Sequence, residues 1–163
     1  DAQYDIAKKT IVENTCRRVL YIAGRRNEYV TDERVNAMHA LASDMGLTLM
    51  IRNGESSEKK ARDITFRYAA NKDIVVCGSD LMAIGAMNAL TEMDIFRPVC
   101  GFDGVTLMGY VGKQMNTVRQ DFANIGANAV AELKRLFDGE AGMNASLSLM
   151  PGSMARATAG CAI

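Results

Sequence analysis

Residues 73–103 constrain the fold of this chain more than any other stretch. Two apolar runs, at residues 74–77 and 99–100, flank a helix-length segment at 81–93. Two strands joined by a helix form a parallel βαβ unit. In sheets built this way, polar residues just past the carboxyl ends of the strands face the ligand crevice. The polar residues placed for that role are Ser79, Asp80 and Asp103.

The rest of the chain continues this alternation of helices and strands. Gly46 is placed to end one helix, and the residues placed to begin helices are Thr31, Ser56 or Ser57, and Asp121. The expected helices are 1–14, 31–45, 57–70, 81–93 and 121–138, with a short helical turn at 105–110. The expected strands are 18–23, 47–51, 74–77, 99–100, 115–118 and 147–150. The pattern predicts an α/β fold with a mainly parallel sheet and helices on both faces.

Composition excludes several classes of protein. The 163 residues are 48% apolar, which is enough for the core of one domain, and the formal net charge is zero. Without a basic block this part of the chain is not expected to bind DNA itself, and no apolar run is long enough for a membrane span. His39 is the single histidine, so no metal or cofactor is expected. The cysteines lack a C-x-x-C spacing and favour reduced thiols in the cytoplasm, although a disulfide between Cys77 and Cys100 stays open.

The segment 81–93 has apolar residues on nearly every face, and only Glu92 in it is charged. A helix on one side of a sheet needs a single apolar stripe, so we expect its outer face to be covered as well. Full burial inside the domain is one explanation and a subunit interface is the favoured one. The methionines expected at a homodimer interface are Met82, Met87, Met93 and Met108.

Arg34 and Asp103 are the main candidates for ligand binding. A guanidinium offers forked donors, and both residues follow strands whose ends open on one edge of the sheet. A cation and an anion facing one crevice suit a small ligand with several hydroxyls, such as a sugar. The alternatives are a surface ion pair for Arg34 and a local turn for Asp103. Gln120 and Phe122 lie where a strand gives way to a helix, and could bind ligand or serve packing.

Five segments in order resemble the regulatory core of the LacI/GalR family of transcription factors: AKKTIVENTCRRVLYIAG, Arg34, CGSDLMAIGAMNAL, CGFD and NTVRQDFANIGANAVAELKRLFDG. The resemblance implies the type I periplasmic-binding-protein fold, a sugar or related effector, a homodimer built from the helix at 81–93, and DNA binding by a helix-turn-helix headpiece. It implies that the effector is bound by Arg34, Asp103, Ser79, Gln120, Phe122 and Glu28.

The sequence departs from the family pattern in two places that matter. Residues 52–59 contain no aromatic residue, where family members often stack a ring on the ligand. The chain also begins where the second half of the family core begins. Residues 1–163 are therefore expected to form a single partial effector-binding domain, the C-terminal subdomain, without the headpiece. The helix at 121–138 belongs in the family to the other subdomain.

Two other functions remain as alternatives. A solute-binding protein of a sugar transport system shares the fold, but the cysteines and the apolar helix at 81–93 disfavour it. An α/β enzyme is disfavoured because the chain lacks a G-x-G-x-x-G motif, a P-loop, a G-x-S-x-G motif and a metal-ligand cluster. Asp80 and Asp103 could imitate a catalytic carboxylate pair, but nothing else in the sequence supports hydrolysis.

Overall fold

The computed structural model describes residues 2–104, 115–118, 120, 122–137 and 154–157. Its helices are α1 (Ala2–Glu13), α2 (Tyr29–Met45), α3 (Glu58–Tyr68), α4 (Asp80–Glu92) and α5 (Phe122–Phe137). Its strands are β1 (Arg18–Ala23), β2 (Thr48–Asn53), β3 (Ile74–Cys77), β4 (Val99–Cys100), β5 (Met115–Val118) and β6 (Met154–Ala157). The sheet has the order β2-β1-β3-β4-β5-β6, and every pairing is parallel except that between β5 and β6. The predicted α/β class is confirmed.

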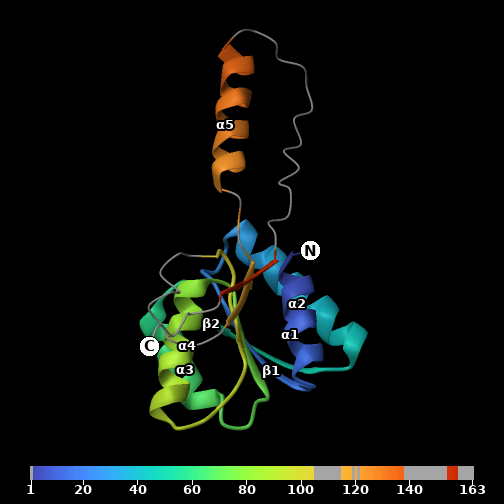
Figure 1. Ribbon diagram of the computed structural model, residues 1–163, viewed down its shortest axis with the longest axis vertical. Helices are drawn as coiled ribbons and strands as arrows, with labels where there is room; N and C mark the ends of the chain where they lie inside the picture. Colours follow the sequence, from blue (N-terminus) through green and yellow to red (C-terminus); the bar gives the residue numbers. More distant parts are fainter. Residues whose placement is uncertain (1, 105–114, 119, 121, 138–153, 158–163) are drawn as a thin grey trace, which may run out of the picture.

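The sheet separates two layers of helices, with α1 and α2 on one face and α3 and α4 on the other (Figure 1). Alternate residues of β1 serve the two layers, as the two-residue period of a strand requires. Tyr21 packs with α1 and α2, whereas Leu20 and Ile22 pack with α3 and α4. Because both faces are covered, the central strands are apolar throughout rather than alternating.

Capping residues begin and end the helices largely as the sequence predicts. The Ser57 hydroxyl accepts a hydrogen bond from the N–H of Lys60 at the start of α3. Gly46 ends α2 in the left-handed conformation, with φ of 61°. The expected cap at Thr31 is wrong. Helix α2 begins two residues earlier, at Tyr29, and its capping position is held by Glu28, whose side chain makes no capping hydrogen bond.

Most of helix α4 is buried within the domain, with Leu81 and Asn88 left exposed, and this corrects the expected outer position of Met82 and Met87. Both methionines are buried in the core between the sheet and α3. The two helices approach closely at Gly85, where a Cβ atom would lie 2.1 Å from the carbonyl oxygen of Glu58. Contact with α3 therefore explains why α4 has apolar residues beyond the stripe that faces the sheet. Met93 is partly exposed, and Met108 lies outside the described residues.

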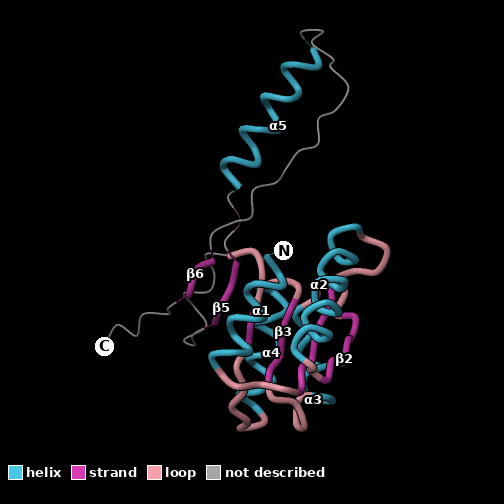
Figure 2. Tube along the Cα trace, turned by 90° about the vertical axis from the view of Figure 1, so that its right-hand side faces the viewer, coloured by secondary structure: helices cyan, strands magenta, loops and turns pink. Residues whose placement is uncertain are grey.

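Helix α5 differs from the other helices because none of its residues is buried. It extends away from the sheet in both Figure 1 and Figure 2. Its stripe includes the exposed side chains Val130, Leu133 and Leu136. At the end of the sheet away from β2, β6 pairs with β5 over residues 154–157, where the sequence predicted only a tail. The strand expected at 147–150 and the turn expected at 105–110 lie outside the described residues.

Three of the cysteines, Cys16, Cys77 and Cys100, are free and buried. Cys77 and Cys100 belong to the cores on opposite faces of the sheet, so the disulfide that the sequence left open is absent between them. Among the described residues, no helix is long and apolar enough to span a membrane.

Candidate functional site

A pocket of about 290 Å³ opens at the carboxyl ends of β1 and β3. From β1 the chain leads through α2 on one face to β2, and from β2 through α3 on the other face to β3. The gap between β1 and β3 is thus the point where the winding reverses, which is where open α/β sheets bind ligands. The pocket is lined by Gly24, Glu28, Val30, Thr31, Arg34, Ser56, Gly78, Ser79, Leu81 and Asp103.

Arg34 is held in the pocket wall by three contacts. Its Nη1 donates a hydrogen bond to the carbonyl oxygen of Gly78 at the end of β3. Its guanidinium carbon lies 3.8 Å from the centre of the Phe102 ring, a cation–π contact. Its Nη2 lies 3.7 Å from Oδ1 of Asp103. Burial lowers the pKa of Arg34, opposed by the nearby Asp103, but an arginine stays charged at any physiological pH.

Asp103 is the anion that faces Arg34. Its Oδ1 accepts a 2.6 Å hydrogen bond from Nε2 of Gln120, while Arg34 lies beyond hydrogen-bond distance. Burial raises the pKa of Asp103, although Arg34 and Gln120 both favour the charged form. The side chain keeps 26% of its surface exposed, toward the pocket. A half-buried carboxylate with one direct donor has unused capacity to accept hydrogen bonds from a ligand.

The structure brings together four of the six residues predicted to bind ligand: Arg34, Asp103, Ser79 and Glu28 all line the pocket. Gln120 adjoins it through its bond to Asp103. The Ser79 hydroxyl also accepts a hydrogen bond from the N–H of Met82, so this residue caps α4 as well. Phe122 is not part of the pocket: it begins α5, and 60% of its surface is exposed.

Sequence reasoning missed other parts of the site. The ring of Phe102, which follows β4, lies against the guanidinium of Arg34, and this contact joins residues that are far apart in the chain. Thr31 and Ser56 contribute hydroxyls to the wall. Conversely, Asp80 does not face the crevice as expected. It is fully buried and accepts a hydrogen bond from Thr117, so it forms no catalytic pair with Asp103.

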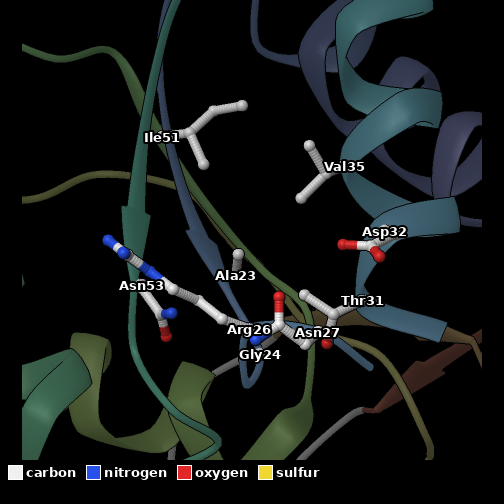
Figure 3. Close-up of a pocket in the computed structure, with 9 residues that line it drawn as sticks. All are labelled: Ala23, Gly24, Arg26, Asn27, Thr31, Asp32, Val35, Ile51 and Asn53. Atoms are coloured by element: carbon white, nitrogen blue, oxygen red, sulfur yellow. The ribbon is translucent and has the colours of Figure 1, made fainter. Parts of the chain in front are cut away.

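A second pocket, of about 280 Å³, adjoins the first at the same edge of the sheet. It lies between α2 and the ends of β1 and β2, and it shares Gly24 and Thr31 with the first pocket (Figure 3). In Figure 3 the side chain of Arg26 reaches across its floor toward Asn53. The two pockets together form one polar surface around Thr31.

The chemistry of the site is that of binding. A guanidinium, a carboxylate, an amide and several hydroxyls offer donors and acceptors to a neutral polar molecule. Within the described part of the chain, no group of three or more His, Cys, Asp or Glu side chains is arranged to hold a metal ion.

Comparison with known proteins agrees with this geometry. Residues 9–159 match the periplasmic binding protein-like domain. The chain belongs to this family. The HTH-type transcriptional repressor PurR of Mannheimia succiniciproducens is 24% identical over 82% of this chain and 42% of its own length. The chain therefore spans less than half of this relative.

Solved structures of similar fold are also transcription regulators. A structure of the Lac repressor bound to ONPG has a TM-score of 0.82 at 21% identity, over 95% of this chain and 50% of that one. A LacI-family regulator from Arthrobacter sp. FB24 in complex with lactose has a TM-score of 0.79 at 20% identity, over 95% of this chain and 63% of that one. The resemblance to the LacI/GalR regulatory core, read from the sequence, is confirmed by the family and the fold.

Proposed function

We propose that this chain is the C-terminal part of the effector-sensing core of a LacI/GalR-type transcription regulator. The observation that carries this proposal is the pairing of Arg34 and Asp103 across one pocket at the winding reversal of the sheet. In the intact regulator, the ligand would be held between two subdomains and would have different affinities for their open and closed arrangements. That difference would shift DNA binding by a separate headpiece in a cytoplasmic protein.

The ligand we propose is a neutral sugar or a related polyol. Arg34 and Asp103 offer a donor fork and an acceptor, and Ser56, Ser79 and Thr31 offer hydroxyls. Glu28 and Gln120 would add contacts from the rim. One of the similar structures named above is in complex with lactose, which supports this class of ligand. Phe122 lies outside this pocket, and at the start of α5 it would meet the ligand only from the side of the cleft that the other subdomain completes.

The second wall of the cleft would come from another subdomain. Helix α5 has an apolar stripe that no described residue buries, and packing against that subdomain would cover it. Residues 1–163 would then be one partial domain. A homodimer would use the exposed part of α4 around Asn88, together with Met93. No catalytic activity is proposed.

The sequence of the gene upstream of Asp1 is the first test. We expect a helix-turn-helix segment followed by about half of an α/β core, since the chain spans 42% of its PurR relative. A secretory leader followed by the same half-core would instead identify a solute-binding protein. In that case the proposed regulator is wrong.

Calorimetric titration of the complete gene product tests the ligand site. The probes are glucose, galactose, maltose and lactose, and Arg34→Met is compared with Arg62→Met, which removes an exposed arginine on α3. We expect at least one sugar to bind, with affinity reduced at least about tenfold by Arg34→Met because a charged hydrogen-bond donor is lost. The Arg62→Met control should bind normally. If Arg34→Met binds as well as the unaltered protein, the pocket is not the ligand site.

A further inference from the structure

Asp80 is a buried carboxylate that the ligand pocket does not use. It is the first residue of α4, at the end of β3, and it has no exposed surface. Its Oδ1 accepts a 2.6 Å hydrogen bond from Oγ1 of Thr117 in β5, which is also buried. Burial of a carboxylate is strongly unfavourable unless hydrogen bonds compensate for it. A buried Asp80 bonded to a buried Thr117 therefore indicates a specific role for these two residues.

Thr117 connects this carboxylate to the turn that carries Asp103. Its Oγ1 donates to Asp80 and also accepts a 3.3 Å hydrogen bond from the N–H of Gly104. The N–H of Asp103 itself donates to the carbonyl oxygen of Val118 at 3.0 Å. The turn is therefore tied twice to β5, once through a side chain and once through the backbone.

The turn needs such support because its backbone is unfavourable. Asp103 has a φ of 117° and Gly104 a φ of 69°. Positive φ is easy for glycine but is strained for an aspartate, and strained residues persist only when their surroundings hold them. Without its ties to β5, we expect Asp103 to relax to negative φ, which would turn its carboxylate away from Arg34.

The backbone before the turn is also fitted to Asp80. The N–H of Asp80 donates a 2.6 Å hydrogen bond to the carbonyl oxygen of Phe102. A Cβ atom on Gly101 would lie 2.3 Å from Oδ1 of Asp80, so only glycine leaves room for the carboxylate. Asp80 thus contacts the two residues that precede Asp103 and, through Thr117, the residue that follows it.

We propose that Asp80 and Thr117 are positioning residues, which hold Asp103 in the conformation that faces Arg34 and Gln120. The inference rests on the proposed function only in assigning Asp103 to a ligand. Neither residue touches the pocket, so both act through Asp103. The Thr117 hydroxyl links the two parts, because it donates a hydrogen bond to Asp80 and accepts one from the N–H of Gly104 in the turn.

Backbone amide hydrogen exchange and the ¹³C resonance of the Asp103 carboxyl group test this in the full chain without a ligand. Thr117→Val removes the hydroxyl with little change in volume, and Thr117→Ser keeps it. In Thr117→Val we expect exchange at Gly104 to accelerate about tenfold, the effect of one lost hydrogen bond, and the Asp103 resonance to shift. In Thr117→Ser, the exchange rate at Gly104 and the Asp103 resonance should both return to the values of the unaltered protein.

Thr65→Val is the matched control. Thr65 is equally buried, and its hydroxyl donates a 2.7 Å hydrogen bond to the carbonyl oxygen of Ala61 within α3, away from the pocket. This variant should destabilise the protein without affecting Gly104 or Asp103. If both valine variants change these two residues equally, the role of Thr117 is general stability and the proposal is wrong.

Asp80→Asn provides a second, nearly isosteric variant should Thr117→Val fail to fold. It replaces a charge-assisted hydrogen bond with a neutral one, so exchange at Gly104 should rise less than in Thr117→Val. Unchanged exchange at Gly104 and an unchanged Asp103 resonance in a folded Asp80→Asn protein would overturn the proposal. Because no ligand enters these measurements, their failure leaves the sugar proposal standing, and the failure of every sugar leaves this one standing.

Discussion

Two arginine–aspartate pairs lie at opposite edges of the sheet and differ in how well the carboxylate is satisfied. At the amino edge, Asp73 accepts hydrogen bonds of 2.7 to 3.1 Å from the backbone N–H groups of Arg17 and Arg18 and from the Arg18 guanidinium. At the carboxyl edge, Asp103 has Gln120 at 2.6 Å but Arg34 only at 3.7 Å.

The pKa values of the two carboxyl groups shift in opposite directions. The hydrogen bonds from the Arg18 side chain, and then those from the backbone, hold the pKa of Asp73 well below its usual range. Burial raises the pKa of Asp103 despite the arginine nearby. The comparison separates two uses of the same pair of residue types. A fully bonded carboxylate joins strands, whereas an incompletely bonded one beside a pocket has capacity left to accept further hydrogen bonds.

Asp103→Asn should have the largest effect on function and little effect on folding. The amide keeps the shape of the side chain but loses the negative charge that attracts Arg34 and that would accept a hydrogen bond from a ligand hydroxyl. We expect the affinity for the sugar that binds best in the titration panel to fall about tenfold to a hundredfold, the range for a charged hydrogen bond. Calorimetry measures the affinity, and urea denaturation at about pH 7, where the favourable contribution of Asp103 in acid is lost, should show little change in the midpoint. An unchanged affinity would remove Asp103 from the site.

Asp73→Asn should lower the stability of the protein and leave its affinity for sugar unchanged. An asparagine oxygen can accept from the backbone, but the charged bonds to Arg18 are lost. The side chain is 27% exposed, so screening by solvent limits the expected loss in unfolding free energy to about 1 kcal/mol. Urea denaturation measures this loss, with Asp63→Asn on the exposed side of α3 as control. If a fully folded Asp73→Asn protein lost its affinity for sugar, the assignment of stability to the amino edge and of binding to the carboxyl edge would be wrong.

Much of the fold could be predicted because the signals that define it are local. The apolar runs at β1 and β3 and the glycine that ends α2 mark their elements directly. The outer face of α4 could not be predicted, because an apolar helix gives no sign of which neighbour covers it. Here the neighbour is α3, which approaches at Gly85, and no periodicity in either helix indicates that contact.

The same distinction applies to the site. Arg34 and Asp103 could be found because they follow strands, and parallel strands bring their carboxyl ends to one edge. The contact of Phe102 with Arg34 and that of Thr117 with Asp80 join residues that are far apart in the chain. Such contacts depend on strand register and helix rotation, which a single sequence does not specify.

The dependence of stability on pH should differ in sign between the two edges. The pKa of Asp73 is lowered by folding, so its contribution is present above the pKa of the unfolded chain and is lost as the pH falls toward the folded value. The pKa of Asp103 is raised, so its favourable contribution is present in acid and is lost as the pH rises through the folded value.

Urea denaturation between about pH 3 and pH 7, a range that spans the ordinary aspartate pKa, measures both slopes. The stability advantage of the unaltered protein over Asp73→Asn should grow as the pH rises. Its advantage over Asp103→Asn should shrink over the same range. Equal slopes for the two variants would show that the carboxylates have similar surroundings, contrary to the comparison.

A third arginine–carboxylate pair should contribute least to the stability of the protein. Arg62 of α3 and Glu92 of α4 make two hydrogen bonds, of 3.1 and 2.6 Å, but both side chains are exposed. The Glu92 side chain is 49% exposed, against 27% for Asp73, so solvent and salt screen its charge more strongly. Hydrogen bonds of similar length should therefore contribute less to stability in this pair. In urea denaturation, Glu92→Gln should shift the midpoint less than Asp73→Asn does, and its shift should vanish in about 1 M salt, where the screening length is roughly 3 Å. A shift as large as that of Asp73→Asn would mean that the guanidinium bonds alone, without the backbone N–H groups of Arg17 and Arg18, account for the strength of the amino-edge pair.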